Sequence, residues 1–393
     1  MGYGTRSQAK KRSPENTTLL SPNRKRALPP AFEDGIRRSK RGSNSLVSLA
    51  RIIVGKSDPG DPPPPDDRKR KNPNGGDPVL FITGAGLSAE SGIPTFRGGS
   101  NAIWSQSLWS HATREAFRLD PLGWYNDFWL CNFPTHYDGY DANRGHEVLA
   151  ELTEMGDVKI VTQNVDGLHS KTKFKWNCEE KLVEAHGRIG LYKCIPDVDT
   201  DSECESDDDD ERPVKLGRRE SGGEIRTVCA YAAKKSIGAD EILPIHVRAA
   251  LNGTAAASGA SNAVKRMLNE RGEVVEESPE IDTPPKCPGC GRFCLPQALL
   301  FDEGYHSHQF YQFEKVESWI ENASAVVFVG TSFSVAITDV ALKYAHEHHI
   351  PVYNFNIGRL ESRTKGVINV IGSAAVTLPL LLEYCKQLTN SEK

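Results

Sequence analysis

The 393-residue chain lacks the features that mark several large classes of protein. It has no run of about 18 apolar residues, which is the length that a membrane-spanning helix needs. Its first residues contain no apolar core of a secretory signal, and Arg6 stands where an N-myristoylation motif requires Ser or Thr. Nine cysteines, an odd number, favour reduced thiols or metal ligands over a disulfide framework. We therefore expect no membrane partner, and cysteines that are available to a metal.

Hydrophobic residues make up only 38% of the chain, and residues 1–76 are particularly polar. Residues 1–75 contain 17 Lys and Arg against 7 Asp and Glu. Such a segment cannot bury enough apolar surface to offset its ordering entropy, so we expect a disordered basic tail. Its basic clusters are typical of nuclear import signals or nucleic-acid contacts, and lie at residues 10–12, 24–26, 37–41 and 68–71. We expect a nuclear protein. A cytoplasmic protein with a solvated linker and a mitochondrial presequence are the alternatives, the last disfavoured by acidic residues in the tail.

The first folded stretch opens with five apolar or β-branched residues, 79–83, which predict a buried parallel strand. The strand leads into Gly84-Ala85-Gly86-Leu87-Ser88-Ala89, the pattern G-x-G-x-x-A. In a βαβ unit the glycines allow a tight turn and a close approach to a pyrophosphate, and the small last residue allows helix–strand packing. We expect the backbone N–H groups of Gly84, Ala85 and Gly86 to bind a pyrophosphate.

Strand-like and helix-like segments alternate along the rest of the chain, which indicates a Rossmann-like parallel α/β sheet. Further strands are expected at residues 158–162, 325–330 and 351–355, and helices at 146–155, 335–348 and 379–388. Polar motifs follow these strands directly, where open α/β sheets bind ligands. We assign residues 77–186 and 299–393 to the sheet domain. Residues 187–298 form a smaller inserted module, with a disordered insert at about 198–284.

Five motifs occur in a characteristic order. They are S-G-I-P-T-F-R-G from Ser91, T-Q-N-V-D-G-L-H from Thr162, His186-Gly187, Gly330-Thr331-Ser332 and Asn354-Phe355-Asn356. Together they resemble the sirtuin family of NAD-dependent protein deacylases. The resemblance implies that an acyl-lysine protein, with histones as one option, gives its acyl group to ADP-ribose as nicotinamide is released.

The resemblance also implies roles for individual residues. His186 is expected to be the general base on the ribose hydroxyls, with Asn164 as a second catalytic residue, and an imidazole suits this task near neutral pH. Gln163 would contact the ribose, while Ile93, Asn164 and Asp166 would shape the nicotinamide pocket. The remaining residues expected at the cofactor are Ala89, Phe96, Arg97, Gly330, Thr331, Ser332, Asn354 and Asn356. Arg97 offers a guanidinium fork suited to phosphate. No acidic residue follows the glycines at the usual distance of about 20 positions, so other groups must bind the ribose.

A metal site is expected where the chain departs from the family. Sirtuins carry two C-x-x-C pairs that hold one structural zinc, and the second pair is present as Cys287 and Cys290. The first pair begins at Cys194, but Asp197 stands three positions later. Zinc accepts a carboxylate oxygen, so Cys194, Cys287, Cys290 and Asp197 could form the site. Alternatives for the fourth ligand are Cys204, Cys229 and Cys294, and loss of the metal is another reading.

Two further segments bear on the substrate. Residues 299–303 take the place of the family's V-V-x-F-G-E segment, which pairs with the substrate peptide as an added strand, and Asp302 replaces the glycine. The stretch from Trp124 to Cys131 contains no arginine but has Asp127, so a neutral acyl group is expected. Residues 201–211 are almost wholly acidic and 252–262 are rich in Ala, Gly and Ser, so both are expected to be disordered. The acidic run could dock on basic partners.

Two other functions would use the same pocket. A sirtuin-like mono-ADP-ribosyltransferase or NAD hydrolase would differ in the acceptor of the ADP-ribosyl group. A noncatalytic NAD-binding scaffold would fit the altered metal pair and the altered substrate segment. Asn164, Asp166 and His186 are all present, which favours the enzyme.

Overall fold

The computed structural model describes residues 40–56, 77–95, 110–133, 137, 139–195, 229, 235–238, 281–358 and 366–391. Several sequence predictions fall outside these ranges. They are the cofactor loop at Phe96 and Arg97, the metal ligands Asp197 and Cys204, and the two low-complexity segments at 201–211 and 252–262.

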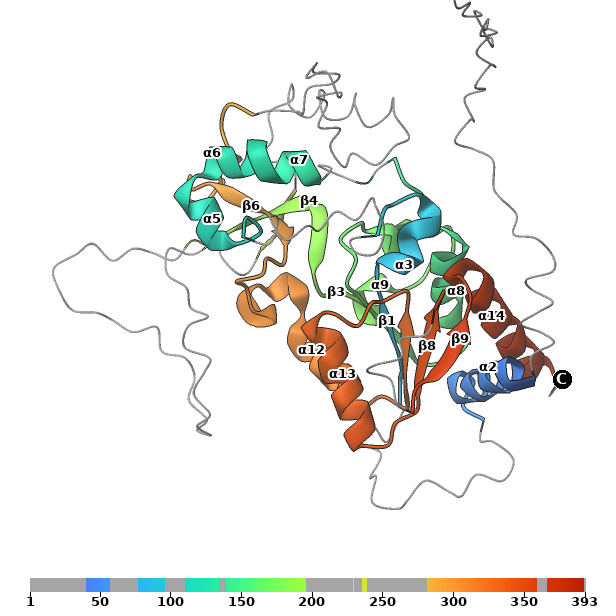
Figure 1. Cartoon of the computed structure of the whole chain (residues 1–393). Coiled ribbons are helices and arrows are strands. Elements are labelled where there is room, and N and C mark those ends of the chain that lie inside the picture. Colours follow the sequence, from blue (N-terminus) through green and yellow to red (C-terminus); the bar gives the residue numbers. More distant parts are fainter. Residues whose placement is uncertain are drawn as a thin grey trace, which may run out of the picture.

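A six-stranded sheet, parallel throughout, forms the larger part of the fold, with the order β3-β2-β1-β7-β8-β9 (Figure 1). The strands are β1 (Val79–Thr83), β2 (Val158–Thr162), β3 (Leu182–Glu184), β7 (Ala325–Val329), β8 (Val352–Asn356) and β9 (Ile368–Ile371). This is the order of the doubly wound dinucleotide-binding fold, with its switch point between β1 and β7. The strand predictions at 79–83 and 158–162 are confirmed, and β7 and β8 lie within one residue of the predicted bounds.

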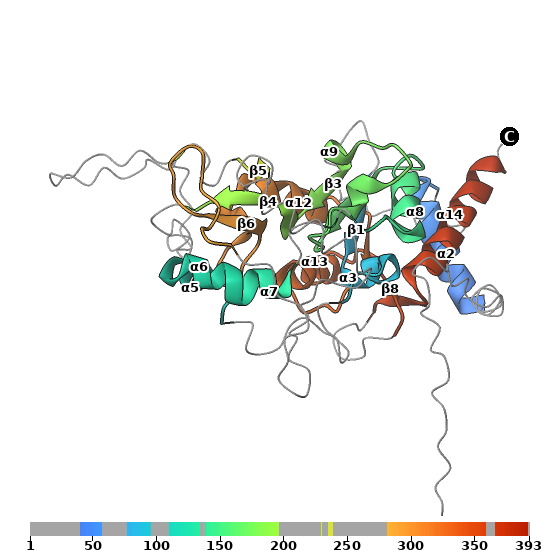
Figure 2. The same cartoon turned by 90° about the horizontal axis from the view of Figure 1, so that it is seen from above.

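Helices cover both faces of the sheet (Figures 1 and 2). One layer contains α2 (Lys40–Ile53), α8 (Arg144–Leu152) and α14 (Ala374–Asn390), and the other α12 (Phe313–Glu321) and α13 (Ala336–Glu347). Alternate side chains of β1 feed the two cores, since Val79 and Phe81 pack with the first layer and Leu80 and Ile82 with the second. The short helix α9 (Cys178–Lys181) leads into β3.

Helix α2 corrects the prediction of a disordered tail for residues 40–53. Its residues Leu46, Leu49, Ala50 and Ile53 recur at helical spacing and are buried in the core that α14 and α8 share. The net basic charge of the tail conceals this one amphipathic segment, and packing on α14 supplies the apolar contact that the segment alone lacks. Beyond α2, Lys56 donates from Nζ to the backbone oxygen of Leu388.

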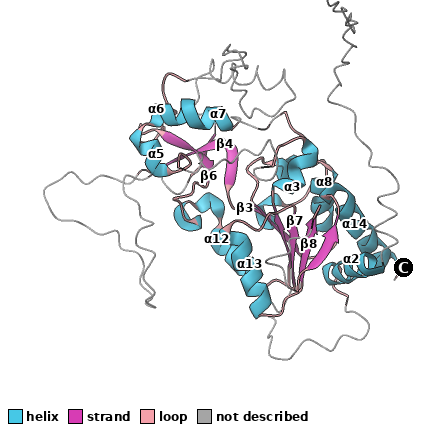
Figure 3. Cartoon of the chain, in the orientation of Figure 1, coloured by secondary structure: helices cyan, strands magenta, loops and turns pink. Residues whose placement is uncertain are grey.

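The smaller module is built around a three-stranded antiparallel sheet of order β5-β4-β6, whose strands are labelled in Figure 2. Figure 3 shows β4 and β6 of this sheet as strands. Its strands are β4 (Gly187–Cys194), β5 (Ile237–Gly238) and β6 (Cys294–Ala298). A helical segment packs on it, made of α5 (Arg114–Leu119), α6 (Pro121–Gly123), a π-helical turn (Trp124–Trp129) and α7 (Leu130–Asn132). The module therefore draws on residues 110–133 as well as on the predicted 187–298. Strand β5 and Cys229 are also ordered parts of the insert expected to be disordered.

Within the described ranges, no helix combines the length and the apolar character needed to cross a bilayer.

Candidate functional site

The turns that follow β1 and β7 pack against each other at the switch point of the sheet. A Cβ on Gly84 would lie 2.9 Å from the oxygen of Gly330, and one on Gly86 would lie 2.7 Å from the Cα of Gly330. Gly330 itself has a φ of +60°, which glycine adopts readily. The glycines thus allow two backbones to approach each other closely, ahead of helix α3 (Ala85–Ser88) and a 3₁₀ turn (Ala89–Ser91).

This packing corrects one detail of the predicted pyrophosphate contact. The N–H of Gly84 donates to the oxygen of Val329 at 2.9 Å, and that of Gly86 donates to the oxygen of Gly330 at 2.9 Å. These two donors are committed to the β1–β7 junction, so they cannot be the main ligands of a phosphate. The glycines of the motif are needed first because the two backbones approach each other so closely. A glycine pattern in a sequence is the same whether it serves close backbone packing or anion binding.

Asn164 and Asp166 meet at the carboxyl end of β2, as predicted. Asn164 donates from Nδ2 to the oxygen of Gly84 at 3.1 Å and to Oγ of Ser88 at 3.0 Å, and the Ser88 hydroxyl donates to Asp166 at 2.6 Å. Burial raises the pKa of Asp166, while the hydrogen bonds from Ser88 and from the Leu168 N–H oppose this. Ser88 is not among the site residues predicted from the sequence. Its place inside the G-x-G-x-x-A motif is the signal that could have found it.

Two buried histidines lie behind this cluster. His169 is 3.2 Å from the hydroxyl of Thr83 through Nε2, and its ring meets that of His146 edge to face with centroids 5.0 Å apart. Burial lowers the pKa of His169 to about 4, so the ring is neutral at pH 7. His146 contacts Ser88 at 3.5 Å and accepts at Nδ1 from the N–H of Asn143. Both rings therefore support the cluster from the core side.

His186 lies at the junction of the two parts of the fold, after β3 and before β4. Its Nδ1 is 3.0 Å from the backbone oxygen of Gln163, so this nitrogen carries the proton and Nε2 keeps a free electron pair. Burial lowers the pKa of His186 to about 4, and the bond to the Gln163 oxygen opposes the shift only in part. A neutral imidazole of this tautomer can accept a proton at Nε2. Its second partner is Tyr305, whose hydroxyl is 3.0 Å from Nε2 and which was not predicted from the sequence.

Several buried polar atoms at this edge have no hydrogen-bond partner among the described residues. Nε2 of Gln163, just after β2, and Oδ1 of Asn354, in β8, are two of them. Such atoms are costly unless a ligand satisfies them, so the edge fits a polar ligand such as a dinucleotide. The structure brings the predicted adenosine-side residues together at the ends of β7 and β8. Asn356 donates to the oxygen of Thr331 at 2.9 Å, and Ser332 begins the loop before α13. Ile93 is buried with the apolar residues of the smaller module.

Four cysteines from three separate segments form a cluster in the smaller module. The sulfurs of Cys194, Cys229, Cys287 and Cys290 all lie within 4.8 Å of one another. The pairs Cys194–Cys290 and Cys229–Cys287 are 3.6 and 3.5 Å apart. Zinc with Zn–S bonds of about 2.3 Å places its sulfurs about 3.8 Å apart, so the cluster fits a tetrahedral zinc. Three predicted ligands are thus confirmed as a cluster. Cys229, one of the alternatives, is the fourth cysteine of the cluster, and Asp197 lies outside the described residues.

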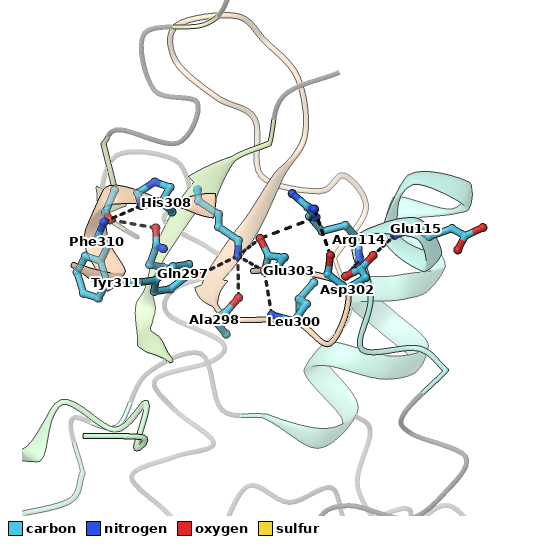
Figure 4. Close-up of polar contacts among 12 residues, drawn as sticks. Arg114, Glu115, Gln297, Ala298, Leu300, Asp302, Glu303, His308, Phe310 and Tyr311 are labelled. Carbon is cyan, nitrogen blue, oxygen red and sulfur yellow. Dashed lines mark hydrogen bonds and ion pairs between the residues drawn. The ribbon is translucent and has the colours of Figure 1, made fainter. Parts of the chain in front are cut away.

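The segment expected to bind substrate rests on a buried ion pair between Lys193 and Glu303. Lys193 Nζ donates to Glu303 Oε1 at 2.8 Å, to the hydroxyl of Tyr311 at 2.8 Å and to the oxygen of Ala298 at 2.7 Å. Burial lowers the pKa of Lys193, and Glu303 counteracts this. Figure 4 shows Glu303 next to Arg114 on one side and Leu300 on the other. The pair ties β4 to the start and the end of residues 299–303.

Asp302, which replaces the expected glycine, faces the first turn of α5 (Figure 4). Its two carboxylate oxygens accept from the N–H groups of Arg114 at 2.8 Å and Glu115 at 3.1 Å. Among the described residues, positive φ angles outside glycine occur only at Gln312, Phe333 and His349. Asp302 therefore has an ordinary backbone conformation, and its side chain anchors the segment to α5.

The fold and the site define a Rossmann-like α/β protein with an inserted four-cysteine module. A family model described as the Sir2 family matches residues 84–230. NAD-dependent deacetylase sir2E of Dictyostelium discoideum is 37% identical over 322 residues, which cover 81% of this chain and 77% of that protein. An NAD-dependent protein deacylase of Thermococcus kodakarensis is 28% identical over 313 residues, 79% of this chain and 91% of that protein. The chain belongs to the Sir2, or sirtuin, family.

Solved structures share the fold. A Sir2 enzyme, from a study of the mechanism and regulation of Sir2 enzymes, matches with a TM-score of 0.52 and 20% identity, covering 88% of this chain and 99% of that chain. A Sir2 homologue in complex with NAD matches with a TM-score of 0.51 and 19% identity, over 87% of this chain and 94% of that chain.

Proposed function

We propose that this protein is an NAD-dependent protein lysine deacylase, which transfers the acyl group of a lysine to ADP-ribose and releases nicotinamide. The observation that carries the proposal is His186. Its imidazole is neutral, its Nδ1–H donates to the Gln163 oxygen, and its Nε2 lies where the sheet domain meets the smaller module. The names of the two relatives described above support the same activity.

Each neighbouring group has a part in this reaction. The unpartnered Nε2 of Gln163 would donate to a ribose hydroxyl, and the Asn164–Ser88–Asp166 cluster would bind the carboxamide of nicotinamide. Nε2 of His186 would take the proton of a ribose hydroxyl once nicotinamide has left. Asn354, Asn356, Thr331 and Ser332 would hold the adenosine side. Phe96 and Arg97, outside the described residues, would cover the cofactor.

The four-cysteine cluster would hold a structural zinc. All four positions are supplied by thiolates, which is typical of structural rather than catalytic zinc. The metal would join Cys194 at the end of β4 to Cys229 and to the Cys287–Cys290 turn, and so keep the module in register with residues 299–303.

The substrate would be an acyl-lysine peptide that pairs with the backbone of residues 299–303. Asp127 is exposed while its neighbours Trp124, Tyr125 and Phe128 are buried, so the charge of Asp127 does not bear on the acyl pocket. The proposed preference for a neutral acyl group therefore rests on the lack of an arginine in this helical segment alone. The basic clusters of the tail support a nuclear location, and the acidic run at residues 201–211 supports basic substrates such as histones.

Mass spectrometry of the full chain with NAD and a panel of acyl-lysine peptides tests the function. We expect deacylated peptide and an O-acyl-ADP-ribose, both lost in His186→Ala and kept in His346→Ala, an exposed histidine on the far end of α13. ADP-ribosylated protein or free ADP-ribose without deacylation would indicate the transferase or hydrolase instead. If no NAD is consumed, the result would indicate a noncatalytic NAD-binding scaffold.

A further inference from the structure

Tyr305 contacts the catalytic candidate His186 through both its ring and its hydroxyl. It lies in a 3₁₀ turn (Tyr305–Ser307) just after the segment expected to bind substrate. Its hydroxyl is 3.0 Å from Nε2 of His186, and the two rings are nearly parallel, at 25°, with centroids 5.8 Å apart. On the other side Phe313 stacks on Tyr305 at 4.4 Å and 12°. A three-ring stack therefore fixes the plane of the imidazole.

The tautomer of His186 sets the direction of its hydrogen bond with the Tyr305 hydroxyl. Nδ1–H of His186 donates to the Gln163 oxygen, so Nε2 carries no proton and can only accept. A backbone hydrogen bond with Ile337, the second residue of α13, lowers the pKa of Tyr305. Burial outweighs it and raises the pKa of Tyr305 to about 12, so the phenol keeps its proton at neutral pH. The protonated hydroxyl therefore donates to Nε2 of His186.

The hydrogen bonds then form a directed chain. The Tyr305 O–H donates to Nε2 of His186, and Nδ1–H of His186 donates to the Gln163 oxygen. Both ring nitrogens thus have a defined partner and a defined role, and the ring is held neutral because protonation of Nε2 would remove the acceptor that Tyr305 needs.

We propose that Tyr305 is a positioning residue for His186. The Tyr305 hydroxyl keeps Nε2 of His186 unprotonated, and the Tyr305 ring fixes the imidazole plane. A ribose hydroxyl then takes the place of the phenol at Nε2. The inference rests on the proposed role of His186 as the base. Tyr305 itself gains and loses no proton: the ribose O–H bond breaks, an Nε2–H bond forms, and the ribose oxygen keeps the electron pair.

Two variants separate the hydroxyl from the ring. Tyr305→Phe removes the hydroxyl and keeps the stack on Phe313, whereas Tyr305→Leu removes both. The matched control is Tyr344→Phe, on α13 far from the start of that helix. It removes a phenol hydroxyl that donates to the backbone oxygen of Glu321, on α12, at 3.3 Å. The ionisable groups on the elements around His186 are Asp166, Glu184 with its partner Arg188, His306 and Asp339, and no variant changes them.

The deciding measurement is the pH profile of kcat/KM for deacylation, with kcat and KM for NAD determined separately. For Tyr305→Phe we expect kcat within about threefold of wild type at pH 8, and an acid limb shifted upward by about one pH unit, because a donor to the neutral imidazole is lost. For Tyr305→Leu we expect kcat to fall about tenfold at pH 8 with KM for NAD little changed, because the ring is no longer aligned. Tyr344→Phe should match wild type in both.

Unchanged pH profiles and kcat values in both Tyr305 variants would overturn the proposal. If Tyr305→Leu fails to fold, as judged by thermal melting, Tyr305→Phe still decides through its pH profile. Nitrogen NMR of the imidazole, assigned with His186→Ala, adds a second test, since the Nε2 signal should move in Tyr305→Phe and stay in Tyr344→Phe. Full activity of His186→Ala would refute the proposed base itself, whereas loss there with unaltered Tyr305 variants would refute only this inference.

Discussion

The sheet domain and the four-cysteine module are assembled in different ways. Strands β1, β2, β7 and β8 are short continuous apolar runs, and each carries its polar motif at its own carboxyl end. The module is made from residues 110–133, 187–195, 229, 235–238 and 281–298, which are far apart in the chain. Local sequence therefore suffices to place the elements of the sheet, whereas the module depends on long-range contacts and, under the proposal above, on a structural zinc.

Removal of a cysteine ligand should have the largest effect, confined to the module. Cys229→Ser is expected to lose its zinc and the order of residues 281–298, because a structural zinc contributes directly to folding. Metal analysis by mass spectrometry should find one zinc per chain in the wild type and none in the variant. Cys294→Ser, which alters a buried cysteine outside the cluster, is the control and should keep its metal. Equal zinc in both variants would mean that Cys229 is not a ligand.

The buried ion pair should give the next largest effect. Lys193→Met leaves Glu303 buried without its main partner, which typically costs about 3–5 kcal/mol of folding free energy. Urea unfolding measures this cost, and the double variant Lys193→Met with Glu303→Gln should recover a large part of it. A double variant as unstable as the single one would show that the cost comes from lost packing of the Lys193 side chain and not from the unpaired charge of Glu303.

Helix α2 offers a test in the sheet domain. Leu49 is fully buried between α2 and α14, so Leu49→Ala should cost about 2–5 kcal/mol. Val47→Ala, at a half-buried position on the same helix, should cost much less. Similar unfolding midpoints for the two variants would contradict the docking of α2 on the core.

Loss of the Asp302 carboxylate should have a smaller effect. Asp302→Ala removes the acceptor of two N–H groups at the start of α5, where lost caps cost about 1 kcal/mol. Because the carboxylate also anchors residues 299–303, we expect a higher KM for the peptide with kcat little changed. An unchanged KM for the peptide would mean that the contact of Asp302 with α5 does not contribute to substrate binding.

Acid should change the activity little until pH is low. Burial lowers the pKa of His186 to about 4, so the neutral base is present above that pH and is lost as pH falls through it. We therefore expect kcat/KM to stay level between pH 8 and about 6 and to fall near pH 4, measured where circular dichroism shows the chain still folded. An acid limb near the ordinary histidine value of about 6.5 would contradict the buried neutral ring.

The accuracy of the sequence predictions follows the same division. The strands at 79–83 and 158–162 and the meeting of Asn164 with Asp166 could be predicted, because each depends on a short run of neighbours. Cys229 as fourth ligand, the Lys193–Glu303 pair and Tyr305 at His186 could not be singled out, since residues 35 to 119 positions apart are brought together only by the fold. Helix α2 was missed for another reason: its apolar face is hidden in a basic composition.

Analysis of the reaction products decides whether His186 is the base of a lysine deacylase. The full chain would be incubated with NAD and an acetyl-lysine peptide, beside His186→Ala. We expect one nicotinamide and one O-acetyl-ADP-ribose for each acetyl group removed, and neither product above background from the variant. Deacetylation of the peptide by His186→Ala at the wild-type rate would contradict it.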